Sequence, residues 1–466
     1  MSDAPTPDEG RCAGPGVQDY LDRDTRPVPS TLRHSANDVT GRDDIPVDRY
    51  LSADYARLEM ERVWYRAWQF ACLESELEAV GDIALYEIGT QSVVIVRSGP
   101  GRIQGFLNSC LHRGRRLREH AGHAPELRCP YHSFAWNLDG TFKGMPCPWD
   151  FPHVKAEDFC LPEVQVDTWR GFVFVNLDPG ATPLADHLGG FTESWVWPIE
   201  QRYKAVHVAR VIPVNWKTGQ EAFMESYHVL GTHPQTLLWM GDANSQYDAT
   251  SAEPHWNRMI NPQAVPSPHV ADQASEQAVL ESFYESRTFY AADRGRDLQA
   301  DGGHPAVPEG ESARAVLAQA MRDQLAATSG DDYSAASDSE MLDAVQYFVF
   351  PNLHPWGGNK SNIVFRWRPD GLDPGSSIFD VIIMASWPQG QERPAPAAVV
   401  WVTGGMQYTD LPQLGLLGPV LDQDMDNLHQ MRAGLASSRK GLTLGVYQES
   451  RLRHFHQALD AWMDRD

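Results

Sequence analysis

Residues 225–233 read Glu-Ser-Tyr-His-Val-Leu-Gly-Thr-His, a stretch with one carboxylate and two histidines. On a helix, Glu225 and His228 would share one face, because side chains three residues apart are neighbours. His228 and His233 would lie about 140° apart, since each residue of a regular helix turns it by roughly 100°. The two histidines can therefore share a site only if the backbone leaves the regular helix between them.

The residues around the second histidine indicate where that departure occurs. Gly231 and Pro234 are of the types found where a helix bulges or ends. We therefore expect the turn after His228 to swing His233 back toward the same site. Glu225 is expected on the regular helical part, on the same face as His228.

Length and charge narrow the class of protein. The chain of 466 residues is long enough for two or three domains, and its acidic residues outnumber its basic ones by 62 to 39. A formal net charge of -23 repels phosphate backbones and anionic lipid, so we expect no nucleic acid or membrane partner. No apolar run approaches the roughly 20 residues that span a bilayer. The first ten residues lack a signal-peptide pattern, and a cytoplasmic location is expected.

Patterns along the chain predict an α+β protein in three parts. Residues 1–45, rich in Asp, Pro, Ser and Thr, predict a mobile arm that orders only against a partner. Residues 46–178 predict a leading helix and a small all-β domain, because short alternating segments there are bounded by turn residues. Those segments are residues 82–89, 92–98, 102–108 and 171–178.

The remaining residues, 179–466, predict a larger domain of one antiparallel sheet with helices packed on it. Its strands are expected near residues 204–216, 361–369, 376–388 and 398–404. Between the first two strands lie the opening stretch and a long polar, helical insertion at about 240–340. Ser337 and Glu340 form a capping-box pattern there. A last amphipathic helix is expected at about 420–437.

A first group of metal-binding residues lies in the β domain. Cys110 and His112 form one short motif, and Cys129 and His132 form a second. Zinc fingers usually pair their cysteines in one motif and their histidines in the other. One cysteine and one histidine in each motif suit a [2Fe–2S] cluster with two thiolates on one iron and two imidazoles on the other. Structural zinc is the alternative.

This spacing resembles the Rieske pattern C-x-H followed by C-x-x-H. The residues around it agree, with Arg113 and Gly114 after the first motif and Tyr131 within the second. One departure is Ser133, where many relatives carry glycine. Arginines cluster around the first motif and have two interpretations, salt bridges within the protein or a docking patch for an acidic ferredoxin or reductase. They are Arg113, Arg115, Arg116 and Arg118.

The second group of metal-binding residues is the opening stretch. Two histidines and one carboxylate form the facial triad that holds non-haem Fe(II) and leaves positions open for dioxygen. The spacing of His228 and His233 alone is weak evidence, but residues 215–234, NWKTGQEAFMESYHVLGTHP, resemble the iron motif of Rieske non-haem iron oxygenases. The resemblance implies that both histidines bind iron and that Glu225 bridges to the Rieske centre of a neighbouring subunit. Ala222 departs from it, standing where asparagine is common.

The third iron ligand is expected on the C-terminal helix. Residues 420–438 resemble the family's acidic ligand segment, and the alignment of Gln423 and Asp424 with it makes Asp424 the ligand. Asp422 and Asp426 remain alternatives, each with an ordinary role as an acid stabilised by the helix dipole.

A further segment, residues 349–358, resembles one near the substrate pocket of relatives. Asn352, His354 and Trp356 would line that pocket, or the segment is a turn fixed by its prolines.

The resemblance implies a large (alpha) subunit with a Rieske domain before a helix-grip, START-like catalytic domain. Its implied cofactors are a [2Fe–2S] cluster and a mononuclear Fe²⁺, with electrons from NAD(P)H through a separate ferredoxin or flavin reductase. The implied reaction uses O₂ for cis-dihydroxylation, monooxygenation or dealkylation of an aromatic or other organic small molecule. Relatives assemble head to tail as α₃ trimers or as α₃β₃ with a small subunit. The alternative is an iron–sulfur electron-transfer protein without oxygenase activity.

Overall fold

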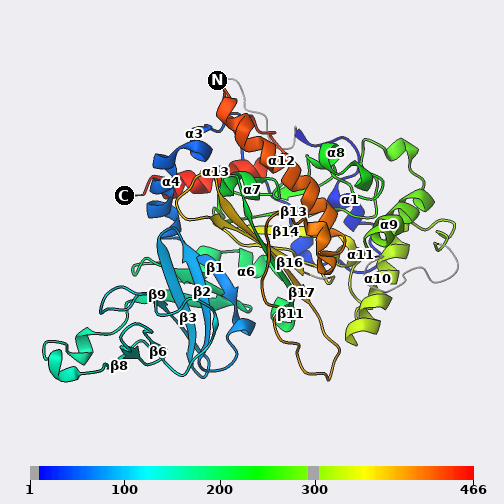
Figure 1. Ribbon diagram of the computed structural model, residues 1–466. Coiled ribbons are helices and arrows are strands. Elements are labelled where there is room, and N and C mark those ends of the chain that lie inside the picture. Colours follow the sequence, from blue (N-terminus) through cyan, green and yellow to red (C-terminus); the bar gives the residue numbers. More distant parts are fainter. Residues whose placement is uncertain (1–9, 292–303, 361, 466) are drawn as a thin grey trace.

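A seven-stranded antiparallel sheet forms the N-terminal domain in this computed structural model, which describes residues 10–291, 304–360 and 362–465 (Figure 1). Its strand order is β1-β10-β9-β4-β3-β2-β5. The four strands predicted in this domain are confirmed as β2, β3, β4 and β10. The bounds of the seven strands are β1 (Gln69–Leu73), β2 (Asp82–Ile88), β3 (Gln91–Gly99), β4 (Arg102–Leu107), β5 (Gly122–His123), β9 (Glu163–Trp169) and β10 (Phe172–Asn176).

A small three-stranded sheet extends this domain away from the rest of the molecule (Figure 1). It consists of β6 (Leu127–Arg128), β7 (Ala135–Trp136) and β8 (Phe142–Gly144). Its Trp136, with Leu117 and Phe134, shares a core cluster with Val94 and Phe106 of the seven-stranded sheet. Apolar packing therefore joins the tip, and the loops it carries, to that sheet.

The second large sheet has the order β15-β16-β17-β11-β18. Its strands are β11 (Tyr203–Ile212), β15 (His354–Pro355), β16 (Asn362–Pro369), β17 (Ser377–Ala385) and β18 (Val400–Val402). The prediction of one wholly antiparallel sheet is wrong at its edge, because β18 pairs parallel with β11. The chain reverses after β17 as in a hairpin, but β11 already occupies the position beside β17. β18 therefore pairs on the far side of β11 and runs in the same direction.

The long polar segment is not purely helical. It contributes β12 (Gln246–Asp248) and β13 (Trp256–Asn261), which join β14 (Ala344–Val349) in a third sheet. Arg258 on β13 is buried and bonds Asp248 at 2.7 Å. A buried ion pair thus occupies a position where a strand prediction expects an apolar residue. Three helices follow along the segment, α9 (Glu276–Ala291), α10 (Ala313–Ser329) and α11 (Asp338–Leu342). The predicted capping box of Ser337 and Glu340 is confirmed at the start of α11.

The predicted C-terminal helix is α12 (Leu417–Ser437), but it is not the last one. A further helix, α13 (Ser450–Met463), was not expected, because arginines and histidines interrupt its apolar pattern and are themselves buried. Its Phe455 and Trp462 enter a core cluster shared with Trp64 and Tyr86 of the N-terminal domain. The helix therefore fastens the two domains together. Within the described ranges, no helix has the length and apolar character needed to cross a membrane.

The N-terminal segment corrects another expectation. Residues 10–45 pack against the two domains of their own chain, without a partner chain. They form α1 (Val17–Leu21) and α2 (Ser30–Arg33), whose Val17, Leu21 and Leu32 are buried in a cluster with residues of both domains. Residues 1–9 of the predicted arm lie outside the described residues. The leading helix expected from residue 46 consists of α3 (Asp48–Leu51), α4 (Ala53–Glu59) and a π-helical turn, η2 (Met60–Trp64).

Polar contacts reinforce the boundary between the domains. Lys204 on β11 is 3% exposed and bonds Glu76 at 2.6 Å. Arg366 on β16 donates to the carbonyl of Ala71, which lies on β1. The Asn352 side chain pairs with the backbone of β1, since its oxygen accepts from Phe70 N at 2.9 Å and its nitrogen donates to Phe70 O at 3.2 Å. Asn352 is thus occupied in joining the domains.

Buried neutral histidines make this fold sensitive to acid. His187 on α5 (Leu184–Leu188) is 3% exposed and its Nε2 lies 2.7 Å from the carbonyl oxygen of Phe350. Burial, and then the neighbouring His255, lower the pKa of His187 to about 3. An unfolded histidine has a pKa near 6.5, so the unfolded chain gains a proton below that pH while folded His187 stays neutral.

We therefore expect stability to fall as the pH drops from 6.5 toward 3, with about 2 kcal/mol of the loss at pH 5 due to His187. The variant His187→Gln keeps a hydrogen-bond donor but cannot titrate, and should lose correspondingly less between pH 7.5 and pH 5. Urea unfolding at both pH values measures this. His429→Gln, at an exposed position, is the control and should follow the unmodified protein. An equal loss in His187→Gln and in the unmodified protein would contradict the assignment.

Candidate metal centres

Two loops at the tip of the N-terminal domain carry the predicted cluster ligands. Cys110 and Cys129 are 3% and 1% exposed, whereas His112 and His132 are half-buried. The two imidazole rings lie 4.7 Å apart between centroids. Both cysteines belong to one buried cluster, so the two thiols lie on the inner side. Burial raises the pKa of the Cys110 thiol, against the hydrogen bond from the backbone of His112. Two inner thiols and two outer imidazoles fit the donor set of a Rieske [2Fe–2S] cluster.

Both loops make the same backbone turn. The carbonyl of each cysteine accepts a bond from the N–H four residues later, which is Gly114 in the first loop and Ser133 in the second, at 2.8 and 3.0 Å. Both of these residues are left-handed, with φ of 75° and 59°. Ser133 thus takes the conformation that favours glycine, at a cost of about 1 kcal/mol. The departure at Ser133 noted in the sequence leaves the turn intact.

Two of the four arginines near the first loop form ion pairs within the domain. Arg115 bonds Glu119 at 2.9 Å, and Arg116 bonds Glu87 at 3.1 Å. Arg113 lies over the ring of Tyr131, 5.4 Å from its centroid. The salt-bridge interpretation therefore applies to Arg115 and Arg116.

The opening stretch of the sequence is folded differently from the expectation. Helix α7 (Trp216–Glu221) ends before Glu225, which lies in a non-helical turn and not on the regular helical part predicted for it. The short helix α8 (Val229–Thr232) follows. His228 is its N-cap and His233 its C-cap, and a 3₁₀ turn, η7 (Pro234–Thr236), begins directly afterwards.

A buried polar cluster holds that turn. The Ser226 hydroxyl donates to the carbonyl of Asp242 at 2.9 Å and lies 2.8 Å from the hydroxyl of Tyr247. Its backbone N–H donates to the same Tyr247 hydroxyl at 3.2 Å. The two histidines flank a four-residue helix, and the backbone leaves helical geometry at His233 (φ -124°, ψ 48°). The two imidazole rings lie 5.2 Å apart between centroids.

The structure brings His228, His233 and Asp424 together. The Oδ1 atom of Asp424, on α12, lies 2.9 Å from Nε2 of His233 and 3.8 Å from Nε2 of His228. Ligand atoms of the three residues all lie within 4.8 Å of one another, and in the described part of the chain they are the single His, Cys, Asp or Glu group with this property. Two imidazole nitrogens and one carboxylate oxygen match the facial triad for Fe(II).

The alternative carboxylates on α12 have other positions. Asp422 accepts bonds from the N–H groups of Tyr408 and Thr409 at 2.8 and 3.0 Å, which makes it a cap for that turn. Asp426 is exposed. Asp424, at 5% exposed, is the one of the three that faces the histidines.

The other ring nitrogens of both histidines also have partners. Nδ1 of His228 lies 2.7 Å from Oε1 of Glu225, and Nδ1 of His233 lies 2.8 Å from Oε1 of Gln423. Burial lowers the pKa of His228, but the Glu225 and Asp424 carboxylates outweigh it and raise that pKa to about 9. A metal cation must therefore displace a proton from His228 at neutral pH. The contact of Gln423 was not anticipated, although its place beside Asp424 was an available signal.

Of the predicted pocket residues 349–358, two are engaged elsewhere. Asn352 joins the domains, as described above. His354 is buried, with its Nε2 3.2 Å from Oε1 of Gln220, and burial holds its pKa well below the usual range. Trp356 packs against Phe365 on the sheet, in the cluster that also receives α12.

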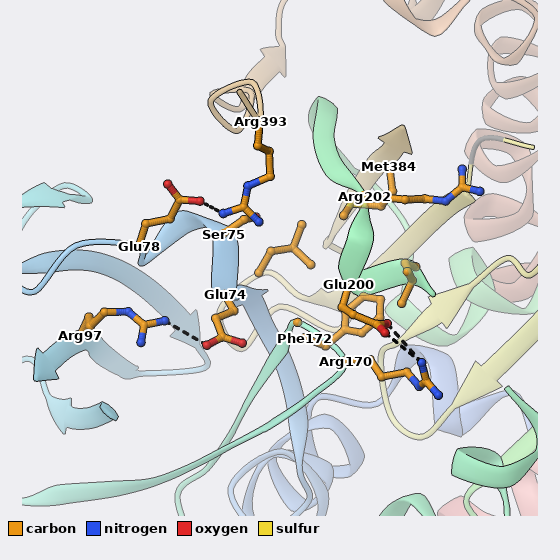
Figure 2. Close-up of a pocket in the computed structure, with 13 residues that line it drawn as sticks. Glu74, Ser75, Glu78, Arg97, Arg170, Phe172, Glu200, Arg202, Met384 and Arg393 are labelled. Atoms are coloured by element: carbon orange, nitrogen blue, oxygen red, sulfur yellow. Dashed lines mark hydrogen bonds and ion pairs between the residues drawn. The ribbon is translucent and has the colours of Figure 1, made fainter. Parts of the chain in front are cut away.

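A cavity of about 410 Å³ lies apart from both metal centres, between the two domains. Figure 2 shows three arginine–glutamate pairs along its walls, Arg97–Glu74, Arg170–Glu200 and Arg393–Glu78. Because each of these cations already has its carboxylate, the cavity is a polar seam between domains.

Comparison with known proteins gives two family matches. Residues 67–155 match the Rieske [2Fe-2S] domain, and residues 195–465 match the ring hydroxylating alpha subunit (catalytic domain). Both ranges fall inside the two domains expected from the sequence, whose boundaries stay a prediction.

The chain is similar to several curated proteins over part of its length. It is 29% identical over 219 residues to the glycine betaine monooxygenase oxygenase subunit of Pseudomonas aeruginosa, covering 45% of this chain and 50% of that protein. It is 31% identical over 191 residues to the chlorobenzene dioxygenase subunit alpha of Cupriavidus sp., covering 39% and 42%. The chain thus spans about half the length of the curated relatives it matches.

Solved structures show the same fold at low identity. A quaternary ammonium Rieske monooxygenase in complex with L-carnitine superposes with a TM-score of 0.61 at 18% identity, covering 91% of this chain and 96% of the other. A naphthalene 1,2-dioxygenase mutant bound to phenanthrene superposes with a TM-score of 0.61 at 16% identity, covering 92% and 94%. The expected α+β class and two-domain order are confirmed.

The position of Asp424 leads to a direct test. Asp424→Asn should weaken Fe(II) binding at this site by more than about a hundredfold, since a lost ligand costs more than the 10- to 100-fold of a lost outer partner. His228→Ala should do the same, and both variants should keep the Rieske EPR signal. Asp426→Asn is the matched control on the same helix. Iron analysis after anaerobic loading measures the effect, and stoichiometric mononuclear iron in Asp424→Asn would rule out the assignment.

Proposed function

Because the chain belongs to the family of ring-hydroxylating alpha subunits with a Rieske domain, we propose that it is the oxygenase component of a Rieske non-haem iron mono- or dioxygenase. One observation carries the proposal for the catalytic centre. His228, His233 and Asp424, which are far apart in the sequence, converge as a two-histidine, one-carboxylate group. Glu225 adjoins it through His228.

Bound at the two sites, a Rieske cluster supplies single electrons and a ferrous ion supplies dioxygen activation. Cys110, Cys129, His112 and His132 would hold the cluster. At the other site, Nε2 of each histidine and Oδ1 of Asp424 would hold the iron from one side, which leaves the opposite side for O₂ and an organic substrate.

The contacts of Glu225 suit two roles, which are to fix the orientation of His228 and to link it to a second group. Its Oε1 lies 2.7 Å from Nδ1 of His228, and its Oε2 accepts from the His228 N–H at 3.0 Å. The first contact holds one proton on Nδ1, so the proton that a metal ion displaces is the one on Nε2. Each carboxylate oxygen has a second acceptor position. We assign that capacity to a Rieske imidazole of a neighbouring subunit.

The arrangement of the molecule favours transfer between copies. β6 and β8, beside the Rieske loops, lie at the lower left of Figure 1, far from α8, beside the iron site, at the upper right. Large apolar side chains are exposed near both centres, Tyr131 and Trp149 near the cluster and Tyr227 and Leu230 near the iron site. Exposed apolar patches mark protein contacts. We therefore propose a head-to-tail homotrimer, with or without a small subunit.

Electrons would reach the Rieske loops from NAD(P)H through a separate ferredoxin or flavin reductase. The exposed guanidinium of Arg113 lies beside the second loop and is the arginine best placed to meet an acidic partner. The paired Arg115 and Arg116 contribute less net charge to such a surface.

For the substrate we propose an organic small molecule of one of two kinds. Glycine betaine and carnitine monooxygenases are among the similar proteins, which favours a quaternary ammonium compound. Chlorobenzene and biphenyl dioxygenases are also among them, which favours an arene. The product would be an alcohol or dealkylated compound in the first case and a cis-diol in the second.

The proposal is tested by iron content and product together. The oxygenase should contain about three irons per chain, two in the cluster and one at the triad, whereas an electron-transfer protein would contain two. With a surrogate reductase, NADH and O₂, a panel of quaternary amines and arenes should yield an oxygenated product with ¹⁸O from ¹⁸O₂. Two irons per chain and no oxygenated product would favour the electron-transfer alternative.

The proposed bridge leads to a second expectation. Glu225→Ala, loaded with saturating Fe(II), should retain both metal centres but lose about a hundredfold or more of coupled turnover, since it lacks the link between them. Reduction of the Rieske cluster by the reductase should proceed at the normal rate, which stopped-flow absorbance measures. Glu193→Gln, at an exposed position on α6 (Phe191–Ser194), is the control. If Glu225→Ala turns over at a rate near that of the control, the bridging role is contradicted.

A further inference from the structure

The two histidines of the iron site are supported by chemically different partners. Nδ1 of His228 faces the carboxylate of Glu225, whereas Nδ1 of His233 faces the neutral amide of Gln423 at 2.8 Å. Gln423 directly precedes Asp424 on α12, so one turn of one helix supplies both a ligand and the contact to another ligand. The Nδ1 partner of His228, Glu225, comes instead from its own segment.

A second side chain fixes the orientation of that amide. Nε2 of Gln235 donates to Oε1 of Gln423 at 2.8 Å, and the same oxygen lies 2.8 Å from Nδ1 of His233. An oxygen held by one N–H donor presents an acceptor, not an NH₂ group, to the imidazole. His233 must then carry its proton on Nδ1. Nε2 then offers its lone pair to a metal ion that displaces the proton shared with Oδ1 of Asp424, 2.9 Å away.

The neutral amide also sets the charge of the site. Asp424 and Glu225 contribute two negative charges, which balance a divalent metal ion with neutral imidazoles. A carboxylate at position 423 would add a third negative charge beside a histidine that is 4% exposed. It would also raise the basicity of His233, as a carboxylate partner does for metal-bound histidines.

We propose that Gln423 is a positioning residue of the metal centre, which holds His233 as the Nε2-binding tautomer through a neutral partner. His228 is then the more strongly donating of the two histidines, on the side where Glu225 adjoins. This inference rests on the proposed function, because it takes the triad as the iron site.

The test compares two substitutions in the full-length protein with its Rieske cluster intact. Gln423→Leu removes the acceptor at similar size, and Gln423→Glu keeps an acceptor but adds a charge. Asn427→Ala is the matched control, because Asn427 lies one turn later on α12 and donates to Thr232, the neighbour of His233, at 3.0 Å. The mononuclear site is emptied by chelation and titrated anaerobically with Co(II), followed by its d–d absorbance.

Gln423→Leu should bind Co(II) about 10- to 100-fold more weakly than the unmodified protein, since His233 loses its tautomer partner. Gln423→Glu should bind at least as tightly as the unmodified protein. After reloading with iron, its Fe(III)/Fe(II) potential should shift negative, since an added negative charge favours the ferric ion. Asn427→Ala should match the unmodified protein in both measurements. The Rieske EPR spectrum reports that the fold is unchanged in every variant.

Unchanged Co(II) affinity in Gln423→Leu, or an unshifted potential in Gln423→Glu, would overturn the inference while leaving the proposed function intact. Failure of the unmodified protein to bind Co(II) or Fe(II) at the triad would overturn the proposed function and this inference with it. Restored affinity in Gln423→Glu beside weakened affinity in Gln423→Leu would support the hydrogen-bond role directly.

Discussion

The contact between Asp424 and His233 joins residues 191 positions apart in the chain, and the catalytic domain is organised around it. A carboxylate and two imidazoles stay within 4.8 Å only if α12 and the segment around α8 keep a fixed distance. Leu421, Met425 and Leu428 of α12 pack against the five-stranded sheet of the catalytic domain, and this apolar contact sets the position of the helix. The polar cluster around Ser226 fixes the position of the segment around α8.

The two halves of the site are built by different physical means. On the helix side, Gln423 and Asp424 occupy successive positions of the regular helix α12. Gln423 faces Nδ1 of His233, and Asp424 faces the metal position. On the other side the backbone is irregular, and buried hydroxyl groups replace the hydrogen bonds that a helix would supply. A rigid element and a pinned turn together leave little freedom to the three ligand atoms.

How much could be predicted depended on whether the signal was local. The cysteine and histidine spacing, the strands of the N-terminal domain and the capping box at Ser337 are properties of short segments, and they are reproduced in the structure. Helix α13 was missed because His454 and Arg451 are buried with partners, which breaks the apolar pattern. The parallel pairing of β18 and the packing of residues 10–45 depend on distant elements. The turn at Glu225 was mistaken for helix because its stabilising partner, Tyr247, lies 21 residues ahead of Ser226.

Helix α13 has a consequence for the order of events during protein synthesis. The N-terminal domain leaves the ribosome first, and domains generally begin to fold as they emerge. Trp64 and Tyr86 share their core cluster with Phe455 and Trp462, which are made only after the whole catalytic sheet. The nascent first domain therefore carries an uncovered aromatic surface throughout most of translation. Transiently exposed apolar surface of this kind is prone to aggregation until α13 covers it.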